Sequence, residues 1–271
     1  MFLCIIIYGE QTMMNNLKLS FSQINLYLKC PMAFYFRYVE RIKIPPSSAL
    51  TLGSSFHKAM QYGFEEKIEK KRYPKSSLIK EVFSDTFDKL KNETEWKKEE
   101  KPGKLKDEGI MTTGIYYNNN AKKMKPKAVE TRFEVEAENK DEEMRYNIIL
   151  IPDLITEDEM IVDFKSKRRS PGQKAGLDTY LQLLLYSLGY IKEYGKKPKL
   201  LRTDYIIFKK DPAIITYKKK PRNDDYNNLL NTIDNVAKAI ENEIFYINPN
   251  CSFCSPDYCG YWKFCMKGKK I

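Results

Sequence analysis

Residues 160–166 read Met-Ile-Val-Asp-Phe-Lys-Ser, and this short apolar and β-branched run predicts a β-strand. Side chains two residues apart share one face of a strand, so Asp163 and Lys165 point the same way. The opposite face then carries three apolar side chains, Met160, Val162 and Phe164. The strand therefore packs one face on a core and presents a carboxylate and an ammonium together on the other.

A second carboxylate comes shortly before this strand. Residues 145–151 predict a partner strand that ends near Asp153 and brings that side chain beside Asp163. Two adjacent carboxylates favour a hard divalent cation, which can activate water and offset charge during phosphodiester hydrolysis. Lys165 would orient the water or neutralise the developing charge. An isolated Asp-x-Lys triplet also occurs in surface hairpins, where the two side chains form only a solvated ion pair.

Three further polar residues have the spacing of site residues. His57 is the single histidine of the chain and lies where a Gly-Ser start leads into a helical pattern. Gln182 and Tyr186 are four residues apart on a strongly apolar predicted helix and share one of its faces. The alternatives are a packing or surface histidine and a buried helix with two tolerated polar groups.

In this order along the chain, the pieces resemble the PD-(D/E)xK nuclease superfamily, specifically its RecB-like branch with the CRISPR-associated and AddB-type iron–sulfur exonucleases. The resemblance runs from about Ser20 to Cys265. Its successive motifs are residues 20–39, Gly53 to His57, Asp153, Asp163-x-Lys165 and Gln182-x-x-x-Tyr186. It implies an α/β fold with a restriction-endonuclease-like core, in which helices flank a central mixed sheet. An N-terminal helical region would precede this core, and a C-terminal Cys-rich Fe–S staple would follow it.

The resemblance also implies a role for each matching residue. A Mg²⁺ or Mn²⁺ ion would be held by His57, Asp153 and Asp163. The catalytic set would comprise Asp153, Asp163, Lys165, Gln182 and Tyr186. Of these, Gln182 and Tyr186 would also lie beside the DNA.

The cysteines indicate a second inorganic group. The chain has six, Cys4, Cys30, Cys251, Cys254, Cys259 and Cys265, and the last four are crowded near the C-terminus. Such crowding predicts a metal site or disulfides, and disulfide scaffolds belong to small secreted domains, whereas this chain is long enough for its own core. Structural zinc is an alternative because four thiolates suit it. The resemblance implies instead a 4Fe-4S cluster that staples the two ends of the domain.

One ligand position of this cluster is ambiguous. Cys30, followed by Pro31, resembles the family's N-terminal ligand, and Cys259 and Cys265 match the last pair of its C-x2-C-x5-C tail. Pro256 occupies the remaining position, so Cys254 or Cys251 must substitute. We favour the ligand set Cys30, Cys254, Cys259 and Cys265, with Cys251 as the rival and Cys4 outside the cluster.

The charge of the chain suits a polyanionic partner. The formal net charge is +11 and the pI is about 9.1. Lys167, Arg168 and Arg169 directly follow the predicted catalytic strand and are expected to contact a DNA backbone. A lysine-rich composition caused by genomic bias would give the same net charge without such a function.

One nuclease domain is predicted over residues 14–271, after a start at 1–13 that is unstructured or misassigned. Its helical part covers about 20–125, its catalytic core about 126–245 and its Cys-rich tail 250–266. Ser20 and Gln23 predict a capping box at the first helix. Glu130 is either an auxiliary acid near the site or a surface or structural carboxylate.

The remaining elements follow from hydrophobic periodicity. Helices are predicted at 53–71, 76–99, 109–124, 178–194 and 223–242. Strands are predicted at 128–138, 145–151, 161–165, 201–209 and 214–218. A charged, mobile connector is expected at 97–108, around Pro102 and Gly103.

Three functions are compatible with these features. The first is a metal-dependent DNA exonuclease acting in recombination, repair, phage DNA processing or CRISPR adaptation. The others are a non-catalytic DNA-binding module and a zinc-stapled partner-binding protein. The expected partner is single-stranded or end-containing DNA, with a helicase or a recombination or CRISPR protein beside it, because the chain has no G-x-x-x-x-G-K-[ST] motif of its own. The apolar run in residues 1–12 is too short to span a membrane, so a cytoplasmic location and no membrane partner are expected.

Overall fold

The computed structural model describes residues 17–139, 144–172 and 175–265. Within them, a five-stranded sheet has the order β2-β5-β6-β7-β8, in which β6 and β7 are parallel and the other neighbours antiparallel. Its strands are β2 (Pro126–Val129), β5 (Leu154–Thr156), β6 (Met160–Lys167), β7 (Leu200–Ile207) and β8 (Ala213–Lys219). The prediction of a mixed sheet is therefore confirmed.

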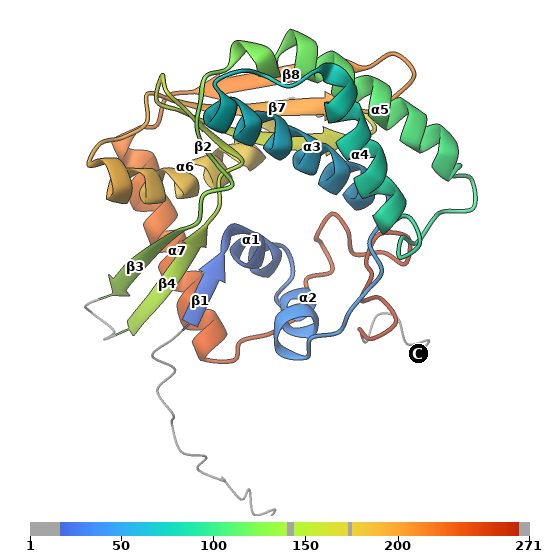
Figure 1. The fold of residues 1–271 in the computed structure, drawn as a ribbon. Helices are drawn as coiled ribbons and strands as arrows, with labels where there is room; N and C mark the ends of the chain where they lie inside the picture. Colours follow the sequence, from blue (N-terminus) through green and yellow to red (C-terminus); the bar gives the residue numbers. More distant parts are fainter. Residues whose placement is uncertain (1–16, 140–143, 173–174, 266–271) are drawn as a thin grey trace, which may run out of the picture.

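Helices cover both faces of this sheet (Figure 1). One layer consists of α3 (Ser48–Lys70), α4 (Ser76–Leu90) and α5 (Pro102–Asn119), followed by a short 3₁₀ turn at Ala121–Lys123. The other face packs against α6 (Ala175–Tyr194). Alternation along β6 explains the two layers: Phe164 joins the core under α3 to α5, whereas Ile161 joins the core under α6.

A smaller sheet lies beside the first, with the order β1-β4-β3. Its strands are β1 (Leu17–Ser20), β3 (Phe133–Asn139) and β4 (Met144–Leu150). The helices packed near it are α1 (Phe21–Lys29), α2 (Pro31–Phe34) with a π-helical turn at Tyr35–Val39, and α7 (Asn223–Glu241). The predicted capping box is present, because the backbone N–H of Ser20 donates to Gln23 and the Gln23 N–H donates to the Ser20 hydroxyl.

Two strand predictions were wrong in the same region. The predicted strand at 128–138 is divided at Glu130, whose φ of 47° is left-handed, so β2 and β3 enter different sheets. The strand at 145–151 exists as β4, but it pairs with β1 and β3 and not with β6. The antiparallel neighbour of β6 is β5, which has only three residues and is too short to give a periodic signal.

Two helix predictions also need correction. Helix α4 ends at Leu90, well before the predicted position 99, and α5 begins at Pro102, within the predicted connector. Proline has no N–H to donate and its φ suits a first helical turn, so Pro102 starts a helix here and does not interrupt one. The connector therefore covers residues 91–101 and lies earlier in the chain than predicted.

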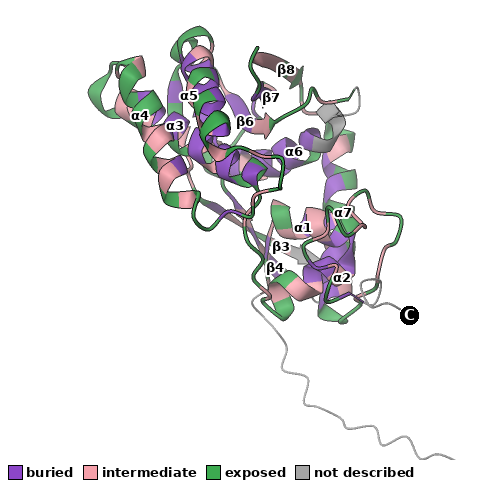
Figure 2. Cartoon of the chain, turned by 90° about the vertical axis from the view of Figure 1, so that its right-hand side faces the viewer, coloured by how far each residue is buried: buried purple, intermediate pink, exposed green. Residues whose placement is uncertain are grey.

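The segment after α7 has turns but no further helix or strand up to Cys265. Figure 2 shows it mostly in the colours of intermediate and exposed residues, with Tyr261 and Cys265 as its buried members. It is anchored to the first helices, since Met32 N donates to Tyr246 O at 3.0 Å and Tyr27 Oη donates to Ile244 O at 2.6 Å. Among the described helices, none carries an apolar stretch long enough to cross a lipid bilayer.

Candidate active site

The site forms where β6 extends beyond the end of its antiparallel neighbour, β5. Strand β5 begins at Leu154, opposite Val162, so the backbone N–H and C=O groups that follow Val162 on this edge of β6 have no strand to bond. Side chains replace that strand: Phe164 N donates to Asp153 Oδ2 at 2.6 Å, and His57 Nε2 lies 3.0 Å from Phe164 O. The backbone of one residue of β6, Phe164, therefore fixes an acid and an imidazole that are far apart in the sequence.

Helix α3 carries His57 to this edge. The helix begins after Ser47, whose hydroxyl accepts from Leu50 N at 3.3 Å. One turn before the histidine, Gly53 faces β6 so closely that a Cβ there would lie 2.6 Å from Ser166 Oγ. Gly53 and His57 are four residues apart and share a helix face, so this close approach brings the imidazole to the strand.

His57 and Asp153 are directly paired, with 3.3 Å between Nδ1 and Oδ1. The carbonyl of Phe164 can only accept, so Nε2 of His57 carries a proton and Nδ1 faces the carboxylate. Burial lowers the pKa of His57, but the charge and hydrogen bond of Asp153 outweigh it and raise that pKa to about 9. Nδ1 is thus placed to hold either a proton or a cation against Asp153.

Asp163 and Lys165 share one face of β6, as predicted. Lys165 Nζ lies 3.0 Å from both carboxylate oxygens of Asp163, and Asp163 is only 1% exposed. Burial, together with the negative charge of Asp153, raises the pKa of Asp163 to about 6. Burial opposes the charge of Lys165, but Asp163 and Asp153 raise the Lys165 pKa above its ordinary value. Lys165 is therefore a cation at neutral pH.

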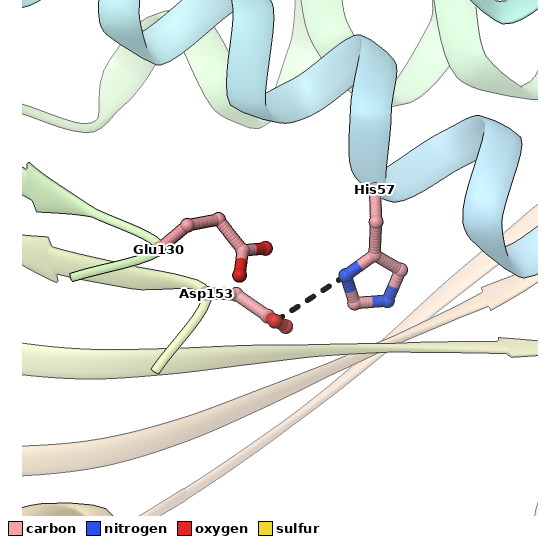
Figure 3. A group of neighbouring side chains, drawn as sticks. All are labelled: His57, Glu130 and Asp153. Atoms are coloured by element: carbon pink, nitrogen blue, oxygen red, sulfur yellow. Dashed lines mark ion pairs between the residues drawn. The ribbon is translucent and has the colours of Figure 1, made fainter. Parts of the chain in front are cut away.

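Glu130 is a member of the site that the predicted metal ligands did not include. One ligand atom from each of His57, Glu130 and Asp153 lies within 4.8 Å of the others, and Figure 3 shows the three side chains converging. Asp163 is not part of this trio and pairs with Lys165. Burial and the nearby charge of Asp153 raise the pKa of Glu130 to about 7.

The chemistry of these donors fits a divalent metal. They combine an imidazole nitrogen with carboxylate oxygens. Burial and the charge of Asp153 raise the pKa values of Asp163 and Glu130, and a cation would favour the ionised form of both carboxylates. Among the described residues, the trio of His57, Glu130 and Asp153 is the one group of three such side chains with this spacing.

Helix α6 brings Gln182 and Tyr186 to the same region. Gln182 Nε2 donates to Tyr186 Oη at 2.6 Å, and both side chains are buried. Burial, followed by the charges of Asp163 and Asp153, raises the pKa of Tyr186. The phenol therefore senses the carboxylates, and the pair borders the site.

The three basic residues after Lys165 differ in their contacts. Arg168 forms an ion pair with Glu108 of α5, a residue that is itself buried. All three are exposed, but Lys167 and Arg169 have no ion pair with a carboxylate among the described residues. Two of the three cations predicted to meet DNA thus lie exposed without such a partner, while Arg168 ties the end of β6 to α5.

Five cysteines line one pocket at the C-terminal segment: Cys30, Cys251, Cys254, Cys259 and Cys265. All five are free thiols, so no disulfide joins the described cysteines, and Cys4 lies outside the described residues. Burial raises the pKa of Cys259, as do the neighbouring sulfurs of Cys30, Cys254 and Cys265. For Cys251, burial and the neighbours Cys30 and Cys254 raise the pKa.

Comparisons with known proteins address the identity of this fold. Among solved structures, a protein from Eubacterium rectale that is proposed to be an exonuclease matches with a TM-score of 0.57 and 12% identity, over 94% of this chain and 92% of that chain. A second structure, SSO0001, has a TM-score of 0.39 and 13% identity over 92% and 96% of the two chains, a likeness too low to carry an argument. No curated protein matches the chain.

A family model gives the decisive match. The model of the PD-(D/E)XK nuclease superfamily matches residues 18–266, which include every described site residue. The solved structure from Eubacterium rectale agrees with this at the level of the fold. The chain belongs to the PD-(D/E)XK nuclease superfamily.

Proposed function

We propose that the protein is a Mg²⁺- or Mn²⁺-dependent deoxyribonuclease that degrades DNA from an end. The observation that carries this proposal is the convergence of His57, Asp153, Asp163 and Lys165 at the free edge of β6. A non-catalytic DNA-binding module of the same fold would have no need to retain this complete set. The name of the Eubacterium rectale protein supports exonuclease over endonuclease action.

The metal would be held by His57, Asp153 and Asp163, and it would supply an activated water and charge compensation on the phosphate. Lys165 is protonated at neutral pH, because Asp163 and Asp153 raise its pKa, so it would stabilise negative charge and would not accept a proton. Its ammonium group would donate a hydrogen bond to a phosphate oxygen as negative charge develops there. Tyr186, oriented by Gln182, would contact the scissile nucleotide.

The DNA would follow the basic residues that extend from the site. Lys167 and Arg169 are exposed beyond the end of the catalytic strand, and the whole chain has a formal net charge of +11. Side chains of this kind contact phosphates without reading sequence, so we propose binding to single-stranded or end-containing DNA of any sequence. Recombination, repair, phage DNA processing and CRISPR adaptation are the cellular settings of this proposal, with a helicase or other protein as partner.

We further propose a 4Fe-4S cluster at the cysteine pocket, held by Cys30, Cys254, Cys259 and Cys265, as in the RecB-like iron–sulfur branch. Cys259 supports this set because its neighbours are Cys30, Cys254 and Cys265. Tetrahedral zinc with bonds of about 2.3 Å would need its four sulfurs about 3.8 Å apart. No three sulfurs of the described cysteines lie within 4.8 Å of one another, which favours the larger cluster.

An assay on end-labelled DNA tests the nuclease. We expect the anaerobically purified protein to release labelled products from linear DNA with Mg²⁺ or Mn²⁺, to be inactive in EDTA, and to spare circular single-stranded DNA. Lys165→Ala removes the ammonium group that would stabilise the developing negative charge, and it should lower kcat by roughly 10²–10³-fold. The control is Lys89→Ala, which removes an exposed lysine from α4. A Lys165→Ala protein that cuts as fast as wild type would rule out this mechanism, and equal cutting of circles would rule out the exonuclease.

A further inference from the structure

Glu130 has an unusual backbone for its residue type. It separates β2 from β3 with a φ of 47°, in the left-handed region that glycine and asparagine adopt most readily. Its N–H donates to Asp153 O at 3.3 Å, so the bend is attached to the residue that carries a site carboxylate. Strained positions of this kind persist where the surrounding structure holds them, and they concentrate at functional sites.

The bend turns the Glu130 side chain into the site. Its carboxylate lies within 4.8 Å of ligand atoms of His57 and Asp153, yet it forms no hydrogen bond or ion pair with another described residue. The charged groups around it are Asp153, His57, Glu65 and Lys58. In Figure 3, Glu130 approaches from the sheet side and His57 from the helix, with Asp153 between them.

Glu159 shows what the same backbone does elsewhere. It is also a left-handed glutamate, with a φ of 67°, in the turn between β5 and β6. Its carboxylate is paired with Lys196 and Lys199 on the surface. Glu159 thus has two lysines as partners, whereas Glu130 faces an imidazole and a second carboxylate.

We infer that Glu130 is a direct ligand of the catalytic divalent metal, in addition to the proposed ligands His57, Asp153 and Asp163. The β2–β3 bend would then supply a ligand next to those from α3 and from the residue that precedes β5. A second observation also points to a cation beside the trio of His57, Glu130 and Asp153. Asp163 is almost completely buried, and its ion pair with Lys165 sets one cation against the carboxylates of both Asp163 and Asp153. A divalent cation would offset the remaining negative charge.

This inference rests on the proposed metal dependence and makes it specific. An imidazole nitrogen among carboxylate ligands favours Mn²⁺ over Mg²⁺, because Mg²⁺ prefers oxygen donors and retains its waters. Mn²⁺ alone, in the absence of DNA, is therefore the appropriate probe. Its binding can be followed by titration calorimetry and by the loss of the free Mn²⁺ signal in electron paramagnetic resonance.

The test compares Glu130→Gln with Glu159→Gln in the full-length protein. Each variant replaces one left-handed glutamate by its isosteric amide. We expect Glu130→Gln to weaken Mn²⁺ binding by 10-fold or more and Glu159→Gln to bind as wild type does. Without metal, in EDTA, Glu130→Gln should melt at or above the wild-type temperature, because it removes one of the carboxylates that crowd Asp153.

Two results would overturn the inference. The first is a Glu130→Gln protein that binds Mn²⁺ with wild-type affinity. The second is a Glu130→Gln protein that binds poorly and also melts below wild type in EDTA, since the glutamate would then have a structural role. Neither result bears on whether the wild-type protein cuts DNA, so this inference and the proposed nuclease function fail separately.

Discussion

His57 Nδ1 lies 3.3 Å from Asp153 Oδ1, and this contact joins the helical layer to the free edge of the central sheet. The other nitrogen of the ring is held by the Phe164 carbonyl, which fixes the orientation of the imidazole. The acid is likewise fixed, since its second oxygen accepts from Phe164 N. The site is thus preorganised by backbone groups of a single strand residue.

Metal binding should stabilise the folded chain. A ligand that binds only the native state adds about 2.7 kcal/mol to the free energy of unfolding when its concentration is 100 times its Kd. The melting temperature in saturating Mn²⁺ should therefore be higher than the one measured in EDTA. Asp153→Asn should abolish this increase, because Asp153 contacts both His57 and the strand edge. Asp158→Asn, which removes an exposed aspartate from the turn between β5 and β6, should retain it. Equal stabilisation of both variants by Mn²⁺ would contradict the assignment of Asp153 as a metal ligand.

Replacing Gly53 by valine should impair the site from a distance. A Cβ at this position would lie 2.6 Å from Ser166 Oγ, and the valine methyl groups would press α3 away from β6 and carry His57 with it. We expect at least a 10-fold loss of nuclease activity together with weaker Mn²⁺ binding. Gly103→Val is the control, because a Cβ at Gly103 has no atom within 4 Å. Similar losses in both variants would show that helix propensity, and not contact with β6, is responsible.

Salt dependence should identify the cations that meet DNA. Each phosphate contact contributes about −0.9 to the slope of log K against log salt on duplex DNA, so Lys167→Ala and Arg169→Ala should each make the slope shallower by about one. Arg168→Ala should instead lower the melting temperature, because it leaves buried Glu108 without its cation. Binding isotherms at several salt concentrations and thermal melts separate the two effects. Unchanged slopes would remove Lys167 and Arg169 from the DNA path.

Single serine substitutions should identify the cluster ligands. The anaerobically purified protein should be brown, with absorption near 400 nm that zinc does not give. Cys254→Ser should lose this absorption and its iron, whereas Cys251→Ser should keep both, because the proposed ligand set contains Cys254, a neighbour of Cys259, and omits Cys251. The reverse outcome would assign Cys251 as the ligand. A colourless wild-type protein containing one zinc would exclude the iron–sulfur cluster.

The attachment of α7 should depend on pH through Asp225. This carboxylate accepts hydrogen bonds from Arg222 and from Tyr180 Oη of α6, which lower its pKa from 3.8 to about 2. A lowered native pKa adds stability above the unfolded pKa, and that stability is lost as the pH falls from about 4 toward 2. Wild type should therefore exceed Asp225→Asn in unfolding free energy at pH 6, and the difference should narrow below pH 4. If urea unfolding gave the same difference in unfolding free energy between the two proteins at pH 6 and below pH 4, the stabilising role of ionised Asp225 would be refuted.

The sequence predicted the site best where its geometry is local. The period of a strand placed Asp163 and Lys165 on one face, and the period of a helix placed Gln182 beside Tyr186. Glu130 was the ligand candidate that the predicted set omitted. Its position depends on a left-handed backbone, and a glutamate gives no local signal of that conformation, unlike glycine or asparagine.

The fold was predictable to a similar extent and for similar reasons. The long amphipathic pattern of α7 predicted 223–242, and the helix runs from Asn223 to Glu241. The short strand β5 has too few residues to show a period, so β4 was wrongly taken as the neighbour of β6. Pairing between strands is decided by tertiary contacts, which hydrophobic alternation does not encode.

The hydrogen bonds from the C-terminal segment to α1 and α2 also constrain how the chain folds during synthesis. Asn248 Nδ2 donates to Lys29 O at 2.8 Å, and Tyr27 Oη donates to Ile244 O, so α1 meets these partners only after residues 244–248 have left the ribosome. Contacts between residues this distant in the sequence form late and slowly. The helices that emerge first therefore keep part of their apolar surface uncovered until residues 244–248 have been synthesised.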